Sequence, residues 1–128
     1  MRKDLKEIYY AFNGKLVGTK RMQKYVCETL SLMPASVVRR ITSNCWFMSS
    51  MDDAFAFTFT GNDLKNQHLI FLSDDLMRQA SSQIKYTIAH EIGHVILAHR
   101  NSTLVRQERE EIRRQEKEAD LFAQKYIV

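Results

Sequence analysis

The sequence predicts an α+β protein in which a small three-stranded antiparallel sheet packs with N-terminal helices, a histidine-containing helix and a C-terminal helix. Three observations predict it: helical spacing of apolar residues at the start of the chain, strict alternation in the middle, and a helix near residue 90 that is apolar on nearly every side. With 128 residues, the chain is long enough for one domain, 1–128, with a single core.

The N-terminal region carries helical signals. Apolar residues recur at helical spacing over residues 5–12, and "NGKLVG" then breaks the run. A second periodic stretch covers residues 20–33. Pro34 ends this stretch and suits the first turn of another short helix, which we expect over residues 34–42.

The period then changes to that of strands. Residues 45–50, "CWFMSS", form a short candidate strand, and residues 53–60, "DAFAFTFT", alternate phenylalanine with alanine or threonine. This alternation predicts a half-buried strand with its aromatic side inward. "QHLIFLS", residues 67–73, follows a turn and predicts a third strand. Because the three segments are closely spaced, we expect an antiparallel meander.

The composition is that of an ordinary globular protein, and it excludes several classes. The net charge is +4, but basic and acidic residues are interleaved, so we do not expect direct nucleic-acid binding. No signal peptide and no run of about 18 apolar residues is present, which predicts a cytoplasmic protein without membrane contact. Cys27 and Cys45 lack metal-type spacing and are expected to be reduced, buried thiols. The oligomeric state stays open.

The helix expected over residues 82–99 contains polar groups that need an explanation, since a buried polar group must be paired. His90 and His94 are four residues apart and share one helical face, so their imidazoles can converge on one point. Glu91 lies 100° around the helix, close enough to reach a water there. This His-Glu-x-x-His arrangement predicts two Zn²⁺ ligands and a general base. The alternative is a pair of ordinary core histidines.

A catalytic zinc site usually has a third protein ligand. The candidate segment is "EKEADLFA", in which Glu116 and Asp120 are four residues apart. If the last helix runs antiparallel to the first and begins near Arg109, Glu116 reaches the metal and Asp120 accepts the free N–H of His90. Three other glutamates stay open as the third ligand: Glu110, Glu111 and Glu118.

The segments "YTIAHEIGHVILAH" and "EKEADLFA" resemble the ImmA/IrrE family of small zinc metallopeptidases, over residues 85–125. The resemblance implies a gluzincin-type core, in which the third ligand is a downstream glutamate. On this basis His90, His94 and Glu116 would bind zinc, and Glu91 would activate water. The resemblance also implies a small sheet beside the active-site helix and a regulatory substrate of the repressor type.

These observations together predict a zinc-dependent metallopeptidase that hydrolyses a peptide bond in a protein or peptide substrate. The alternative is a non-catalytic, zinc-containing regulatory or binding module. The presence of Glu91 counts against this alternative, because a purely structural zinc site needs no general base. The sheet offers two segments, residues 54–60 and 68–72, along which an extended substrate could add as an edge strand.

Overall fold

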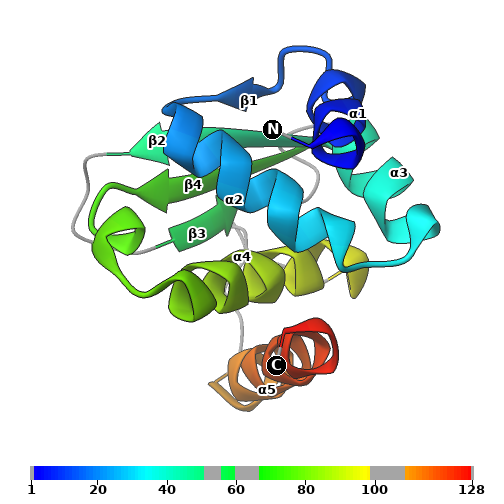
Figure 1. Ribbon diagram of the computed structural model, residues 1–128. Helices are drawn as coiled ribbons and strands as arrows, with labels where there is room; N and C mark the ends of the chain where they lie inside the picture. The colour runs from blue at the N-terminus through cyan, green and yellow to red at the C-terminus, as the bar shows by residue number, and fades with distance from the viewer. Residues whose placement is uncertain (1, 51–55, 60–66, 99–108, 128) are drawn as a thin grey trace.

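The computed structural model describes residues 2–50, 56–59, 67–98 and 109–127. Figure 1 shows how the elements are arranged. In chain order they are α1 (Lys3–Ala11), β1 (Leu16–Val17), α2 (Lys20–Ser31), α3 (Ala35–Asn44), β2 (Cys45–Ser50), β3 (Ala56–Phe59), β4 (His68–Ser73), the 3₁₀ turn η2 (Leu76–Arg78), α4 (Ser81–Ile96) and α5 (Arg109–Tyr126).

The sheet differs from the one expected. It has four strands in the order β1-β2-β4-β3, and β1, β2 and β4 are parallel to one another. Only β3, at one edge, is antiparallel to its neighbour β4. The α+β class holds, but the predicted three-stranded antiparallel sheet is wrong.

The error has a physical reason. The prediction assumed that consecutive strands pair, whereas β2 pairs with β4 along its whole length, from Cys45 opposite His68 to Ser50 opposite Ser73. Parallel neighbours need a long connection, and α2 with α3 supplies it between β1 and β2. Alternation identifies a strand but not its partner. The two-residue strand β1 lies within "NGKLVG", which the sequence analysis assigned to a break.

The helices expected from the apolar periodicity are confirmed, with small shifts at their ends. Local capping explains where two elements begin. The Thr19 hydroxyl accepts a hydrogen bond from the Met22 amide, 3.2 Å away, at the start of α2. The buried Ser73 hydroxyl likewise accepts from the Leu76 amide at 3.1 Å and starts η2.

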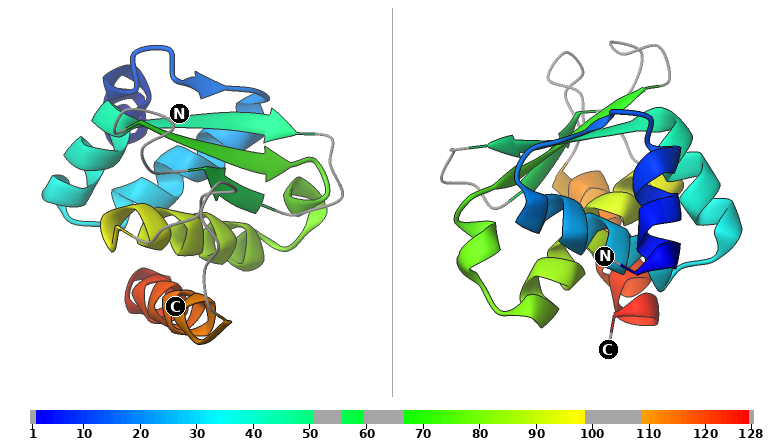
Figure 2. Two further views of the ribbon diagram at one scale, coloured as in Figure 1. Left: turned by 180° about the vertical axis from the view of Figure 1, so that it is seen from behind. Right: turned by 45° about the horizontal axis from the view of Figure 1, so that its top comes forward.

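The helices gather on one face of the sheet. The left view of Figure 2, seen from behind, shows the strands in front of α2. Phe47 of β2 and Ile70 of β4 are neighbours in the register, and both are fully buried. Trp46, on the other face, is 38% exposed. The core therefore lies between this face and the helices. The side chains of β3 lie outside the described residues, and with them the predicted inward phenylalanines.

Helix α4 lies between the sheet and α5 (Figure 1). Its buried side chains Ile84, Ile88 and Ile92 belong to the main hydrophobic core. This position explains why the helix is apolar around most of its circumference, as a helix covered on two sides must be. None of the described helices is long and apolar enough to cross a membrane.

The two thiols are free and buried, as expected. Burial raises the pKa of Cys27 and of Cys45 to about 12 in each case. Both side chains therefore stay protonated at neutral pH and act as small apolar core residues.

Gly18 provides a test of the contact between β1 and β2. A Cβ at Gly18 would lie 2.6 Å from Met22 Cε and would overlap the Ser49 side chain of β2. Its φ of +156° is also rarely adopted by other residues. We expect Gly18→Ala to lower the free energy of unfolding by about 2–3 kcal/mol in denaturant titrations.

Gly14→Ala is the matched control. Gly14 also has a positive φ, +86°, but no atom lies within 4 Å of a Cβ built there. The backbone strain of an alanine at this φ should by itself lower the free energy of unfolding by about 1 kcal/mol. Equal losses for the two variants would contradict the close approach of Gly18 to β2.

Candidate metal centre

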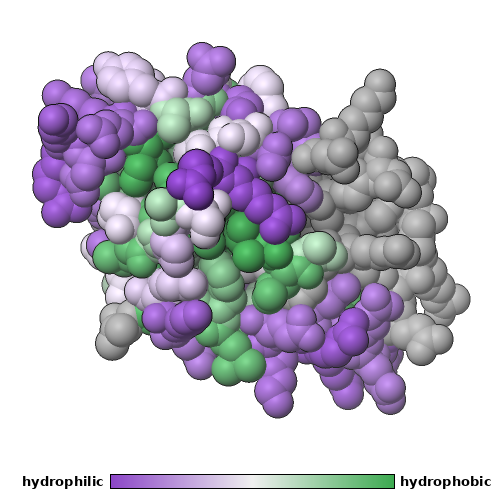
Figure 3. Space-filling view, turned by 90° about the vertical axis from the view of Figure 1, so that its right-hand side faces the viewer, coloured by the Kyte–Doolittle hydropathy of each residue, from purple (hydrophilic) through white to green (hydrophobic). Residues whose placement is uncertain are grey.

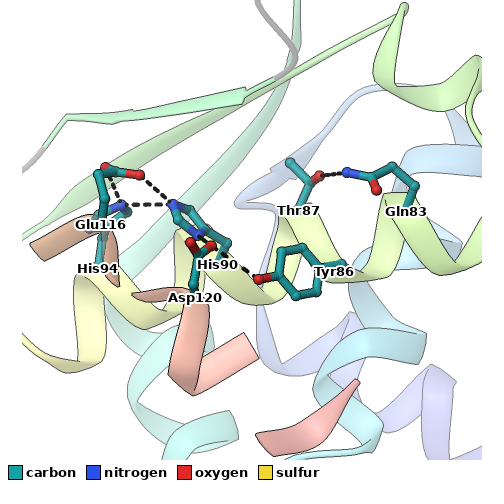
Figure 4. A network of polar contacts seen from close by, with 7 residues as sticks. All are labelled: Gln83, Tyr86, Thr87, His90, His94, Glu116 and Asp120. Atoms are coloured by element: carbon teal, nitrogen blue, oxygen red, sulfur yellow. Dashed lines mark hydrogen bonds and ion pairs between the residues drawn. The ribbon is translucent and has the colours of Figure 1, made fainter. Parts of the chain in front are cut away.

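Two histidines of α4 and one glutamate of α5 converge on one point (Figure 4). The Nε2 atoms of His90 and His94 are 3.1 Å apart. Glu116 lies beside both, with Oε2 at 2.9 Å from His90 Nε2 and Oε1 at 3.0 Å from His94 Nε2. The structure thus brings together the three residues that the sequence analysis selected as metal ligands.

Asp120 lies one turn further along α5 and contacts the other nitrogen of His90. His90 Nδ1 donates to Asp120 Oδ1 at 2.8 Å, because a carboxylate can only accept. With its proton on Nδ1, the neutral His90 ring turns the lone pair of Nε2 toward Glu116 and His94. Asp120 therefore determines both the tautomer and the orientation of this imidazole.

The order of contacts along the two helices is the one expected. Glu116 contacts both His94 and His90, and Asp120, one turn forward on α5, contacts His90. The described part of α5 begins at Arg109, and the connection that precedes it lies outside the described residues. His99 lies outside the described residues.

Gly93 allows the two helices to approach closely. It is buried, and a Cβ built on it would lie 3.1 Å from Phe122 Cδ1 of α5. Any larger side chain at this position, between the two histidines, would press against α5. Gly93 therefore contributes to the packing of the site.

The alternative third ligands lie elsewhere. Glu118 pairs with Arg114 at 3.7 Å in an i,i+4 contact along the surface of α5. Glu110 and Glu111 lie in the first turn of α5. Among the described residues, the group able to hold a metal consists of His90, His94 and Glu116, without these three glutamates.

Exposure differs between the two sides of the cluster. The side chains of His90 and His94 are 16% and 12% exposed, whereas that of Glu116 is 54% exposed. The cluster is therefore anchored in the protein by its histidines and open to solvent on the side of α5. Glu91, one position after His90, is buried. Burying a carboxylate in the apolar part of α4 is costly unless the group is paired.

Tyr86 joins the cluster through a contact that the sequence did not predict. Its hydroxyl donates to the same Asp120 Oδ1 at 3.0 Å. Burial raises the pKa of Tyr86, and the contact with Asp120 adds to the rise, so the hydroxyl remains a donor at neutral pH. Its place one turn before His90 on the same face was the available signal. On the same helix, the side-chain amide of Gln83 donates a hydrogen bond of 3.2 Å to the Thr87 hydroxyl (Figure 4).

The donor set fits zinc. With the His90 proton on Nδ1, His90 Nε2 and the Glu116 oxygens are acceptors, which repel one another at such distances unless a cation or a proton lies among them. A tetrahedral zinc ion with bonds of about 2.0–2.1 Å separates its ligand atoms by about 3.3 Å. The separations here are 2.9, 3.0 and 3.1 Å.

Comparison with known proteins identifies the family. The model of the family Peptidase U49 matches residues 62–128, more than half of the chain, and covers α4, α5 and every residue of the cluster. The match confirms the general expectation of a peptidase but does not extend to the ImmA/IrrE family that the motifs resemble. No curated protein and no solved structure matches significantly. The chain thus belongs to the Peptidase U49 family, whose substrates are proteins or peptides.

Proposed function

We propose that the protein is a zinc-dependent metallopeptidase of the gluzincin type, related to the ImmA/IrrE enzymes. In this proposal His90, His94 and Glu116 hold Zn²⁺, and Asp120 orients His90. The observation that carries the proposal is the convergence of two imidazole nitrogens and a carboxylate within 2.9–3.1 Å, in a chain of a peptidase family. Two histidines and a glutamate are a common ligand set of catalytic zinc in peptidases.

The chemistry divides between the metal and the side chains. When bound, zinc supplies Lewis acidity that polarises the scissile carbonyl and makes water more acidic. Glu91 takes a proton from the attacking water as the C–O bond forms, and passes it to the leaving nitrogen as the C–N bond breaks. Asp120 and Tyr86 keep the imidazole of His90 in one orientation throughout.

The sheet narrows the place where substrate binds. Residues 68–72 belong to β4, which lies between β2 and β3. Both edges of β4 are therefore paired already, and a substrate strand cannot add to it. β3 has a neighbour on one side only within the described sheet, and it contacts α4. An extended substrate adding to β3 would lie beside the helix that carries His90. The resemblance to ImmA/IrrE enzymes favours a regulatory protein, such as a repressor, as this substrate.

Metal content tests the choice of ligand. We expect the wild type and Glu118→Gln to retain about one zinc per chain after dialysis, and Glu116→Gln to lose it. Glu118 is the matched control because it lies two residues away on the same helix and pairs with Arg114. Elemental analysis measures the outcome. Zinc retained by Glu116→Gln but lost by Glu118→Gln would reverse the assignment, and no zinc in any of the proteins would exclude the metallopeptidase.

Removing the support of His90 should weaken zinc binding without abolishing it. Asp120→Asn is expected to lower zinc affinity by about 10–100-fold, because the acceptor for His90 Nδ1 is weakened. Tyr86→Phe retains Asp120, so its zinc affinity should fall by only a few-fold. Competition with a chromophoric chelator measures both. A zinc affinity of Asp120→Asn equal to that of the wild type would mean that Asp120 does not support the site.

Glu91→Gln separates catalysis from metal binding. We expect this variant to keep its zinc but to lose about 10²–10⁴-fold in cleavage rate, because glutamine cannot accept the proton of water. Mass spectrometry of a diverse peptide library and of unfolded casein detects the products, with Glu118→Gln as the active control. Cleavage by Glu91→Gln at the wild-type rate would refute its role as the base. A zinc-loaded wild type that cleaves nothing would favour the non-catalytic binding module.

A further inference from the structure

A groove with a volume of about 1130 Å³ lies outside the metal cluster, between α1 and α2, and reaches α4. Figure 1 shows α2 crossing in front of the sheet with α1 beside it. None of the metal-site residues lines the groove. Lys85 of α4 does line it, and this residue directly precedes Tyr86 in the chain. The groove therefore ends on the helix that carries His90 and His94.

Positive charge is concentrated in this groove. Its charged lining consists of Arg2, Lys6, Lys20, Lys24, Lys85 and Glu28. Five basic residues against one acidic residue give four net positive charges, as many as the whole chain has from 19 basic and 15 acidic residues. The rest of the chain is thus balanced in formal charge. The sequence did not reveal this concentration of positive charge, because basic and acidic residues are interleaved along the chain and the groove residues come from three separate helical regions.

The single acidic residue does not neutralise the groove. Glu28 is engaged by two lysines, with Lys24 Nζ at 3.9 Å and Lys85 Nζ at 3.5 Å. The side chains of Lys6 and Lys20 carry no ion pair among the described residues. Several like charges along a concave surface attract an anionic partner more strongly than isolated surface charges do.

The groove also has apolar lining. Tyr10 is 73% exposed and packs edge-on against Tyr9, with ring centroids 5.4 Å apart. Leu32, at the far end of α2, is 50% exposed. Figure 3, which faces the right-hand side of Figure 1, shows hydrophilic and hydrophobic residues side by side on that face. Basic and apolar residues in one groove fit a polypeptide segment with acidic and apolar side chains better than they fit a small anion.

We propose that the basic groove between α1 and α2 is a docking site for an acidic segment of the protein substrate, separate from the place of cleavage. The choice of a polypeptide over a nucleic acid rests on the membership of a peptidase family. A segment held in the groove would raise the effective concentration of the same substrate beside α4.

Binding of defined polymers to the full-length chain tests the proposal. A fluorescent oligoglutamate peptide should bind the wild type, whereas an oligolysine peptide should not, as measured by anisotropy. Raising the salt from about 0.05 M to about 0.5 M should weaken this binding. The double variant Lys6→Glu/Lys20→Glu should weaken it by about tenfold, because two attractions become repulsions.

The control variant Lys3→Glu/Arg39→Glu changes the net charge equally at exposed positions outside the groove, so its affinity should stay within about twofold of the wild type. Equal weakening in the two double variants would overturn the proposal, as would no binding of oligoglutamate. Tighter binding of an oligothymidylate would instead make the groove a nucleic-acid site.

The test is independent of cleavage. Anisotropy needs neither turnover nor Glu91, so the measurement is repeated in Glu91→Gln with the same expected affinities. If oligoglutamate does not bind to a zinc-loaded, active enzyme, the proposed docking site is refuted and the proposed peptidase activity stands. If oligoglutamate binds but the chain neither holds zinc nor cleaves a substrate, the proposed metallopeptidase is refuted and the proposed docking site stands.

Discussion

The hydrogen bond from His90 to Asp120 joins the metal cluster to the packing of the C-terminal helix. His90 and His94 are largely buried on a helix whose other faces are apolar, and buried imidazoles are costly without partners. Glu116 and Asp120, which contact these imidazoles, both come from α5. The charged helix α5 is therefore held against α4 by the residues that form the site, together with Ala119 and Ala123 in its buried stripe. Packing and chemistry depend on the same interface.

The sheet and the N-terminal helices provide the other half of this arrangement. The isoleucines of α4 anchor one face in the core, which leaves the face of His90 and His94 to α5 and to solvent. β3, at the sheet edge, contacts the same helix. One rigid helix thus connects the core, the metal cluster, the sheet edge proposed for substrate and, through Lys85, the basic groove. Sites on such elements keep their geometry better than sites on loops do.

Local patterns predicted much of this structure from sequence. Residues four apart on a helix must share a face, so the pairing of His90 with His94 and of Glu116 with Asp120 followed from spacing alone. The limits of β2 and β4 followed from apolar runs. The direction and order of the strands did not, because they depend on contacts between residues distant in the chain. The bond from Tyr86 to Asp120 depends on the orientation of both side chains, and the basic groove on the arrangement of three helices.

The central claim, that His90, His94 and Glu116 hold zinc, is tested most directly by X-ray absorption at the zinc edge on the purified chain. The expected spectrum shows two imidazole nitrogens at about 2.0–2.1 Å and carboxylate or water oxygens at about 2.0–2.2 Å, without sulfur. The imidazole signal should fall by half in His94→Ala, if that variant retains metal. A sulfur shell at about 2.3 Å, or a spectrum unchanged in His94→Ala, would contradict the account.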